Sequence, residues 1–170
     1  DYLAYAYLQQ ADDQAADAVL EAMEALEPPF QNHSATAYAF AAVPSRLALE
    51  RHDWEAAADV AVRWPAELEW DQYPYLDAIP HFARALGAAR TGDPATAKSA
   101  IAELERLEKA AGELDIAYDW GIQVAIQRVA AEAWLTYESG DVEAALELAR
   151  EFVARSEERR VGKECRSRWS

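Results

Sequence analysis

The side chains that could do chemistry are few and scattered along the chain. None of the three histidines, His33, His52 and His81, belongs to the H-E-x-x-H pattern that places two zinc ligands on one helix face. The sequence has no G-x-x-x-x-G-K-[ST] or G-x-G-x-x-G loop for nucleotide phosphates, and its single cysteine lacks zinc-type spacing. We therefore expect no catalytic centre, no metal site and no cofactor, and a chain that is not an enzyme.

Acidic residues dominate the charged side chains. The 170 residues include 31 Asp and Glu against 16 Lys and Arg, which gives a formal net charge of −15. Such a charge repels nucleic-acid phosphates and anionic lipids, and no apolar run reaches the roughly 18 residues of a membrane span. We expect a basic protein or peptide partner and no nucleic-acid or membrane partner. The chain should be soluble, and its compartment, cytoplasm or bacterial periplasm, stays open.

A short turn signature recurs four times. Each copy has an aspartate directly after a tight turn and before an alanine-rich run with helical periodicity. A side-chain oxygen at this position can accept the free N–H groups of the following helix, and its charge suits the helix dipole. The four copies are Ala11-Asp12-Asp13, His52-Asp53-Trp54, Gly92-Asp93-Pro94 and Gly140-Asp141-Val142. The repeated unit is therefore helix, tight turn, helix, and no strand pattern competes with it.

Small residues are paired across every one of these turns. In each copy a small residue lies twelve positions before another, which itself follows the turn aspartate by four. The pairs are Ala4 and Ala16, Ser45 and Ala57, Ala85 and Ala97, and Ala133 and Ala145. Two antiparallel helices joined by a short turn bring such positions face to face, and small side chains let the two backbones approach closely.

These turns and small pairs resemble the tetratricopeptide repeat, a helix–turn–helix unit of about 34 residues whose copies stack as a solenoid. The first copy, from Tyr7 through Ala16 to Pro28, fits the pattern best. The middle copies depart from it at Pro44 and Arg84, where the family has a large aliphatic residue. The resemblance implies an all-α protein: an α-solenoid of about four antiparallel helical hairpins near residues 1–28, 35–64, 76–112 and 115–154. It also implies a protein-interaction scaffold that is part of a longer protein.

The resemblance further implies a groove for partners, because the first helices of successive hairpins line the concave face in this family. The candidate groove residues are Tyr5, Arg46, Glu50, Phe82, Arg90, Trp134, Tyr137 and Glu138. Tyr, Trp and Arg are frequent anchors at protein interfaces, although each is equally compatible with burial by the next repeat. The Lys and Asn clamp with which some members hold a terminal carboxylate is missing from these positions.

Residues 65–77 form the longest interruption of the helical pattern and combine aromatic with acidic side chains. The candidate binding residues are Trp70, Tyr73 and Tyr75. Two interpretations are open. The loop binds a basic or Pro-rich peptide through aromatic faces and carboxylates, or its rings cover the apolar edge between the second and third hairpins.

The periodicity predicts helices over residues 2–10, 13–27, 35–51, 54–64, 76–91, 94–111, 115–139 and 142–154. Ser34 can cap the third helix and Pro80 suits the first turn of the fifth, whereas Pro44 should kink the third. Without further repeats at either end, the apolar faces at residues 2–8 and 146–152 should lie open.

The last sixteen residues differ sharply in composition from the rest. The segment 155–170, RSEERRVGKECRSRWS, carries six basic and three acidic residues and no Ala or Leu. It resembles translated read-through of a common sequencing adapter, which implies a non-native tail that is disordered or extends the last helix. Without this tail, the remaining residues 1–154 are still more acidic.

Three functions stay open on the sequence alone. A protein-interaction scaffold comes first, because stacked hairpins leave extended surfaces. A peptide- or small-molecule-sensing segment of a larger regulatory protein is the alternative, and a helical enzyme is third.

Overall fold

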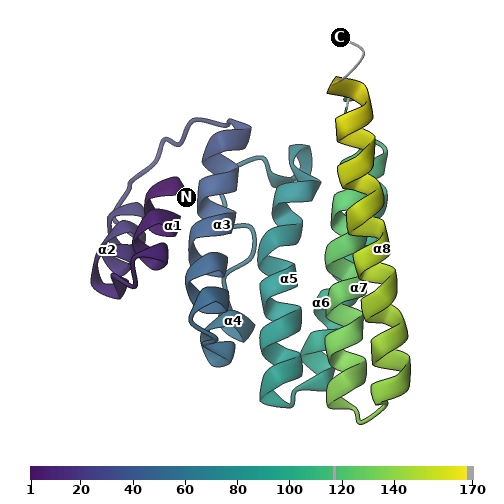
Figure 1. Cartoon of the computed structure of the whole chain (residues 1–170). Helices are drawn as coiled ribbons and strands as arrows, with labels where there is room; N and C mark the ends of the chain where they lie inside the picture. The colour runs from purple at the N-terminus through teal and green to yellow at the C-terminus, as the bar shows by residue number, and fades with distance from the viewer. Residues whose placement is uncertain (117, 168–170) are drawn as a thin grey trace.

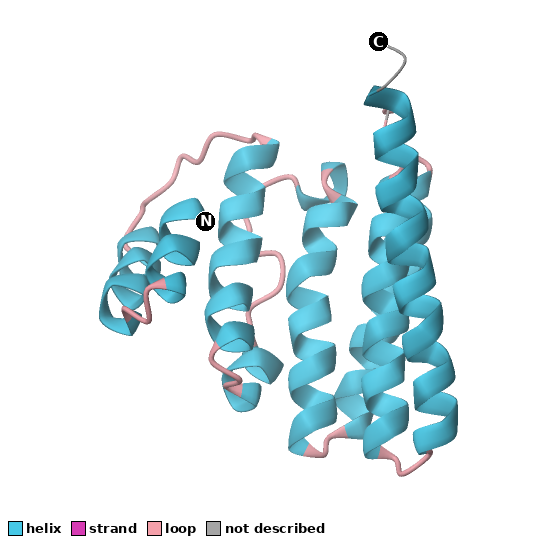
Figure 2. Cartoon of the chain, in the orientation of Figure 1, coloured by secondary structure: helices cyan, strands magenta, loops and turns pink. Residues whose placement is uncertain are grey.

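The described part of the chain consists of helices and connecting loops. The computed structural model describes residues 1–116 and 118–167, with side chains as far as residue 157. No strand occurs among these residues (Figure 2), so the all-α expectation is confirmed. The elements are α1 (Tyr2–Gln9), α2 (Asp13–Glu24), α3 (Ser34–Glu50), α4 (Trp54–Asp59), the 3₁₀ turn η1 (Trp70–Gln72), α5 (Pro74–Thr91), α6 (Pro94–Gly112), α7 (Trp120–Glu138) and α8 (Val142–Ser167). They follow one another across the molecule, from α1 and α2 at one edge to α7 and α8 at the other (Figure 1).

The four predicted turns share one backbone conformation. The residue before each aspartate has a positive φ, 55° at Ala11 and His52, 78° at Gly92 and 94° at Gly140. Each aspartate accepts a hydrogen bond of 3.0–3.1 Å from a backbone N–H in the first turn of the next helix. The left-handed residue ends one helix and the aspartate caps the following one. The turns thereby join α1 to α2, α3 to α4, α5 to α6 and α7 to α8, and the members of each pair are in contact.

The predicted small pairs lie where helices come together. Seven of these eight residues are buried, and Ala133 is half-buried. An even closer approach occurs between α5 and α4. A Cβ atom on Gly87 would lie 2.3 Å from the backbone nitrogen of Ala58 and 2.6 Å from the carbonyl oxygen of Trp54. Only glycine leaves room for this crossing.

Helix α5 is the central element of the described fold. It packs against α3, α4, α6, α7 and η1. One buried cluster, which includes Leu104 and Val124, joins α5 to α6 and α7. A second, around Phe40 and Trp70, joins α3 to α5 and the loop before it. The core is therefore continuous along the row of helices, and α5 connects its two halves.

Within residues 1–154, the largest differences from the predicted helix boundaries are five residues each, at the end of the fourth helix and the start of the seventh. The fourth helix ends at Asp59 instead of residue 64, because Arg63 has a positive φ of 52° and Trp64 precedes a proline, which disfavours helical backbone. The seventh begins at Trp120 instead of residue 115, because the Asp119 side chain caps it by accepting the Ile122 N–H at 3.2 Å.

Two assignments of single residues were wrong. The cap of α3 is His33, whose Nδ1 accepts the Ala35 N–H at 3.0 Å, and Ser34 is already the first helical residue. Because α5 starts at Pro74, two residues earlier than predicted, Pro80 lies inside the helix and not in its first turn. Pro44 lies inside α3, as expected.

Both edges of the described structure expose apolar side chains. Tyr2 is 87% exposed and Leu3 55%, while Leu146 and Val153 of α8 are each about half exposed. The backbone of α8 continues without a break from Val142 past Arg155 to Ser167. The side chains beyond residue 157, which include most of the predicted non-native tail, lie outside the described residues.

Candidate functional site

The three histidines lie in different local environments. His33 caps α3. His52 stacks on Trp54 with ring centroids 5.2 Å apart. His81 lies beside Asp77 in the interior, with 3.8 Å between His81 Nε2 and Asp77 Oδ1. No cluster of three or more metal-ligating side chains occurs among the described residues.

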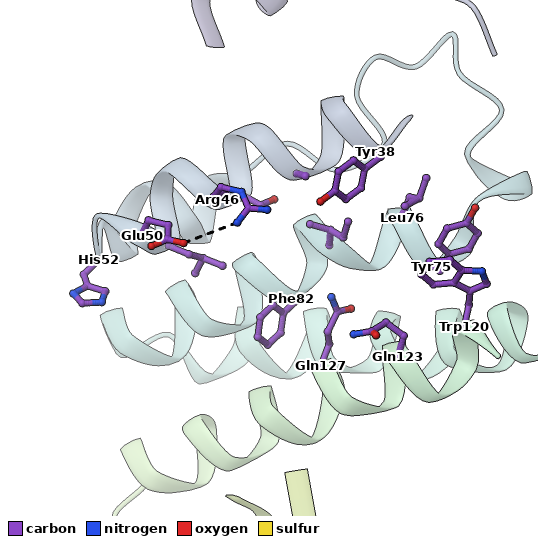
Figure 3. A pocket seen from close by; sticks show the side chains of 14 residues that line it. Tyr38, Arg46, Glu50, His52, Tyr75, Leu76, Phe82, Trp120, Gln123 and Gln127 are labelled. Atoms are coloured by element: carbon purple, nitrogen blue, oxygen red, sulfur yellow. Dashed lines mark ion pairs between the residues drawn. The ribbon is translucent and has the colours of Figure 1, made fainter. Parts of the chain in front are cut away.

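A groove of about 790 Å³ lies between α3, α5 and α7, and we call it the α3–α5–α7 groove. Figure 3 shows α5 between the other two helices, with side chains of all three turned toward the open space. The α5 residues that line the groove are Tyr75, Leu76, Ile79 and Phe82. One wall comes from α3 and its turn, through Tyr38, Ala42, Ser45, Arg46, Leu49, Glu50 and His52. The opposite wall comes from α7, through Trp120, Gln123 and Gln127.

Three of the predicted groove residues, Arg46, Glu50 and Phe82, line this groove. Arg46 already has partners, because its Nε donates to the Asp1 carboxylate at 2.9 Å and its guanidinium lies 5.2 Å from the Tyr5 ring centroid. The Glu50 carboxylate is 4.0 Å from Arg46 and stays 44% exposed. Tyr5 therefore contributes by holding Arg46 and is absent from the groove lining.

The other four predicted residues form a separate cluster where α5 and α7 end. The Arg90 guanidinium lies 5.3 Å from the Trp54 ring centroid and 5.0 Å from that of Trp134. It also donates to Glu138 at 2.8 Å, and Tyr137 packs edge-on against Trp134. These contacts tie α4, α5 and α7 together. The cluster is not part of the groove lining.

The aromatic side chains of residues 65–77 turn mainly inward. Trp70 is 4% exposed, and its Nε1 donates to the Pro65 carbonyl at 2.9 Å. Tyr73 packs on the same buried cluster. Tyr75 stacks on Trp120 at 4.2 Å between centroids and closes one end of the groove. Of the three candidate loop residues, only Tyr75 reaches the groove.

Sequence reasoning missed the wall that α7 contributes. The candidates on this helix, Trp134, Tyr137 and Glu138, came from the resemblance and lie just before the Gly140-Asp141 turn, at the far end of the helix. The signal that could have found the wall is polar: Gln123 and Gln127 are four residues apart in an otherwise apolar run, so they share one helix face. Gln127 is notable because its Oε1 is buried and has no hydrogen-bond partner among the described residues.

A second unmatched polar group lies outside the groove, in the interior beside α5. Both carboxylate oxygens of Asp77 are buried and form no hydrogen bond within the described residues, although Arg63 Nε lies 3.3 Å from Oδ2. Burial raises the pKa of Asp77 to about 6, against the opposing pull of Arg63. Burial also lowers the pKa of His81 to about 4. At neutral pH the pair therefore carries one buried negative charge that is poorly compensated.

None of the helices in the described part of the chain has the length and apolar character to cross a membrane. Comparisons of the chain with protein-family models, with curated proteins and with solved structures give no match.

Proposed function

We propose that this chain is a tetratricopeptide-like α-solenoid that works as a protein-interaction scaffold and binds its partner in the α3–α5–α7 groove. The observation that carries the proposal is the groove itself. Three helices, each the first of its pair, line one continuous hollow with apolar side chains on α5 and aromatic rings at one end. Concave, largely apolar surfaces with a few polar groups are the usual sites of recognition.

The repeated construction supports the solenoid part of the proposal. Four turns of the same left-handed residue and capping aspartate join the helices in pairs. Neighbouring pairs pack through α3 against α5 and through α5 against α7, which are the groove helices. A recognition surface built from alternate helices is what stacked hairpins provide.

The test is a selection of peptides from a phage-displayed random library on the whole 170-residue chain. Gln123 is half-buried on the groove wall, so Gln123→Arg places a long cationic side chain into the groove. Gln14 on α2 is exposed and absent from the groove lining, so Gln14→Arg is the matched control. Selected peptides should bind the wild type and Gln14→Arg equally and Gln123→Arg at least about tenfold more weakly. The absence of any enriched peptide, or peptides indifferent to Gln123→Arg, contradicts the proposal.

Small-molecule sensing is the second candidate, because the groove volume of about 790 Å³ lies within the range of roughly 300–1,000 Å³ typical of ligand sites. A thermal-shift screen of small apolar ligands separates the two functions. A ligand that stabilises the wild type but not Gln123→Arg, together with a failed peptide selection, favours sensing.

A further inference from the structure

The α7 wall of the groove presents two amides in a regular arrangement. Gln123 and Gln127 are four residues apart, which separates them by about 6 Å along the helix axis. Figure 3 shows both side chains extending from α7 toward the groove. Gln127 Oε1 is buried, shielded from water and without a partner among the described residues, so the side chain must turn toward the open groove before this acceptor can reach an occupant. An acceptor left in this state weakens the fold unless an occupant brings a donor.

The spacing of the amides favours one backbone conformation in the occupant. Along an extended chain, residues two apart present the same edge and are about 6.6 Å apart, which nearly equals the rise between the two glutamines. An extended segment can therefore offer a backbone N–H to each amide. A helical occupant uses its own N–H groups internally and leaves Gln127 Oε1 without a partner. The α3 wall from Tyr38 to Glu50 is about 18 Å long, which is room for about five extended residues.

Charge at the far end of the α3 wall selects the side chain that enters there. Glu50 is 44% exposed and 4.0 Å from Arg46, but Arg46 is held by the Asp1 carboxylate at 2.9 Å. The Asp1 ammonium also lies near Arg46, so the two cations balance the carboxylates of Asp1 and Glu50, and Glu50 is the more exposed of these carboxylates. The whole chain has a net charge of −15, and a Lys or Arg of the occupant can pair with Glu50.

We propose that the α3–α5–α7 groove binds about five residues of a basic partner chain in extended conformation. Backbone N–H groups two residues apart donate to Gln123 and Gln127, apolar side chains pack on Ile79 and Phe82, and a Lys or Arg lies against Glu50. This inference rests on the proposed function and adds the backbone conformation and charge of the partner.

The experiment uses the peptides obtained by the selection above, synthesised with one backbone N–H at a time replaced by N–CH₃. Binding to the wild-type chain is measured by fluorescence anisotropy. We expect two sensitive positions, two residues apart, each with an affinity loss of roughly five- to tenfold. In Gln127→Leu, N-methylation of the peptide position that pairs with residue 127 should cause no further loss of affinity, because the acceptor has been removed. The control, Gln14→Leu, should respond to each methylation as the wild type does. Glu50→Gln should weaken peptides with Lys or Arg and leave their uncharged analogues unchanged.

The outcomes separate this inference from the proposed function. No enriched peptide overturns both. Groove-binding peptides that tolerate every single N-methylation, or that gain helix on binding by circular dichroism, overturn the extended conformation alone. Peptides without Lys or Arg that bind as tightly as basic ones overturn the role of Glu50. Because the methylation scan needs only the wild-type protein, it stays decisive even if Gln127→Leu folds poorly.

Discussion

Replacing Asp77 by Asn should make the free energy of unfolding depend on pH, because folding moves one proton from His81 to Asp77. The pKa of Asp77 rises from 3.8 to about 6 in the folded protein, and that of His81 falls from 6.5 to about 4. Between pH 4 and 6 the folded state therefore holds the proton on Asp77, and the unfolded state holds it on His81. Both states bind one proton, so the pair adds no slope to the free energy of unfolding in the wild type.

In each single variant, the remaining group still changes its protonation on folding, and the replaced group no longer balances that change. In Asp77→Asn only the unfolded state binds the His81 proton, so the free energy of unfolding should rise with pH, relative to wild type, by about 1.4 kcal/mol per pH unit. In His81→Gln only the folded state binds the Asp77 proton, so the relative slope has the same size and the opposite sign. Above pH 6.5, Asp77→Asn should exceed the wild type by about 3 kcal/mol, which is the Asp77 shift of about two pKa units.

Urea denaturation, followed by tryptophan fluorescence from about pH 4 to about pH 7.5, measures these slopes. The neighbouring charges of Arg63, Arg106, Glu103 and Asp71 are common to all variants and cancel in the comparison. Asp115→Asn, at an exposed loop position, serves as the control. Profiles of Asp77→Asn and wild type that run parallel across this window refute the reasoning.

Three further predictions concern stability and are checked by thermal and urea denaturation. Trp70→Ala removes a buried ring and leaves the Pro65 carbonyl without its donor, so it should lower the free energy of unfolding by about 3–5 kcal/mol. Tyr2→Ala, at the exposed edge, should lower it little. A small loss in Trp70→Ala would instead favour the loop as a binding surface. Gly87→Ala should cost about 3 kcal/mol or more, because the added methyl meets backbone atoms of α4, and wild-type stability in this variant contradicts the close crossing. Asp53→Ala should cost about 1 kcal/mol through the lost cap of α4, and no loss would show that the cap is dispensable.

The sequence predicted the features that are decided within a few residues. The turn aspartates cap the helices that follow them, because a cap involves only neighbouring backbone groups. The twelve-residue spacing of small residues found buried positions for the same reason, since the turn fixes which residues of the two helices lie opposite. These local rules account for the eight helices of the described chain.

The remaining features depend on contacts between distant residues. The loop after α4 brings Trp64 onto Phe40, with ring centroids 4.9 Å apart, and helical periodicity carries no information about that contact. Trp70 is compatible with both the surface and the core on sequence alone, and only its partners, the Pro65 carbonyl and the cluster around Phe40, place it in the core. The glutamine wall was missed because the resemblance placed the α7 candidates just before the Gly140-Asp141 turn, whereas the groove is lined by residues in the first half of this helix.

The central position of α5 has a consequence for how the groove can change. Both walls, α3 and α7, pack against α5, so the sizes of the α5 side chains set the distance between the walls. The amides and the carboxylate that would contact an occupant are carried by the walls. The width of the groove and the polar groups that contact an occupant are therefore determined by different helices. Substitutions on α5 should retune which side chains fit, and substitutions on α3 or α7 should retune which partner is chosen, with little interference between the two.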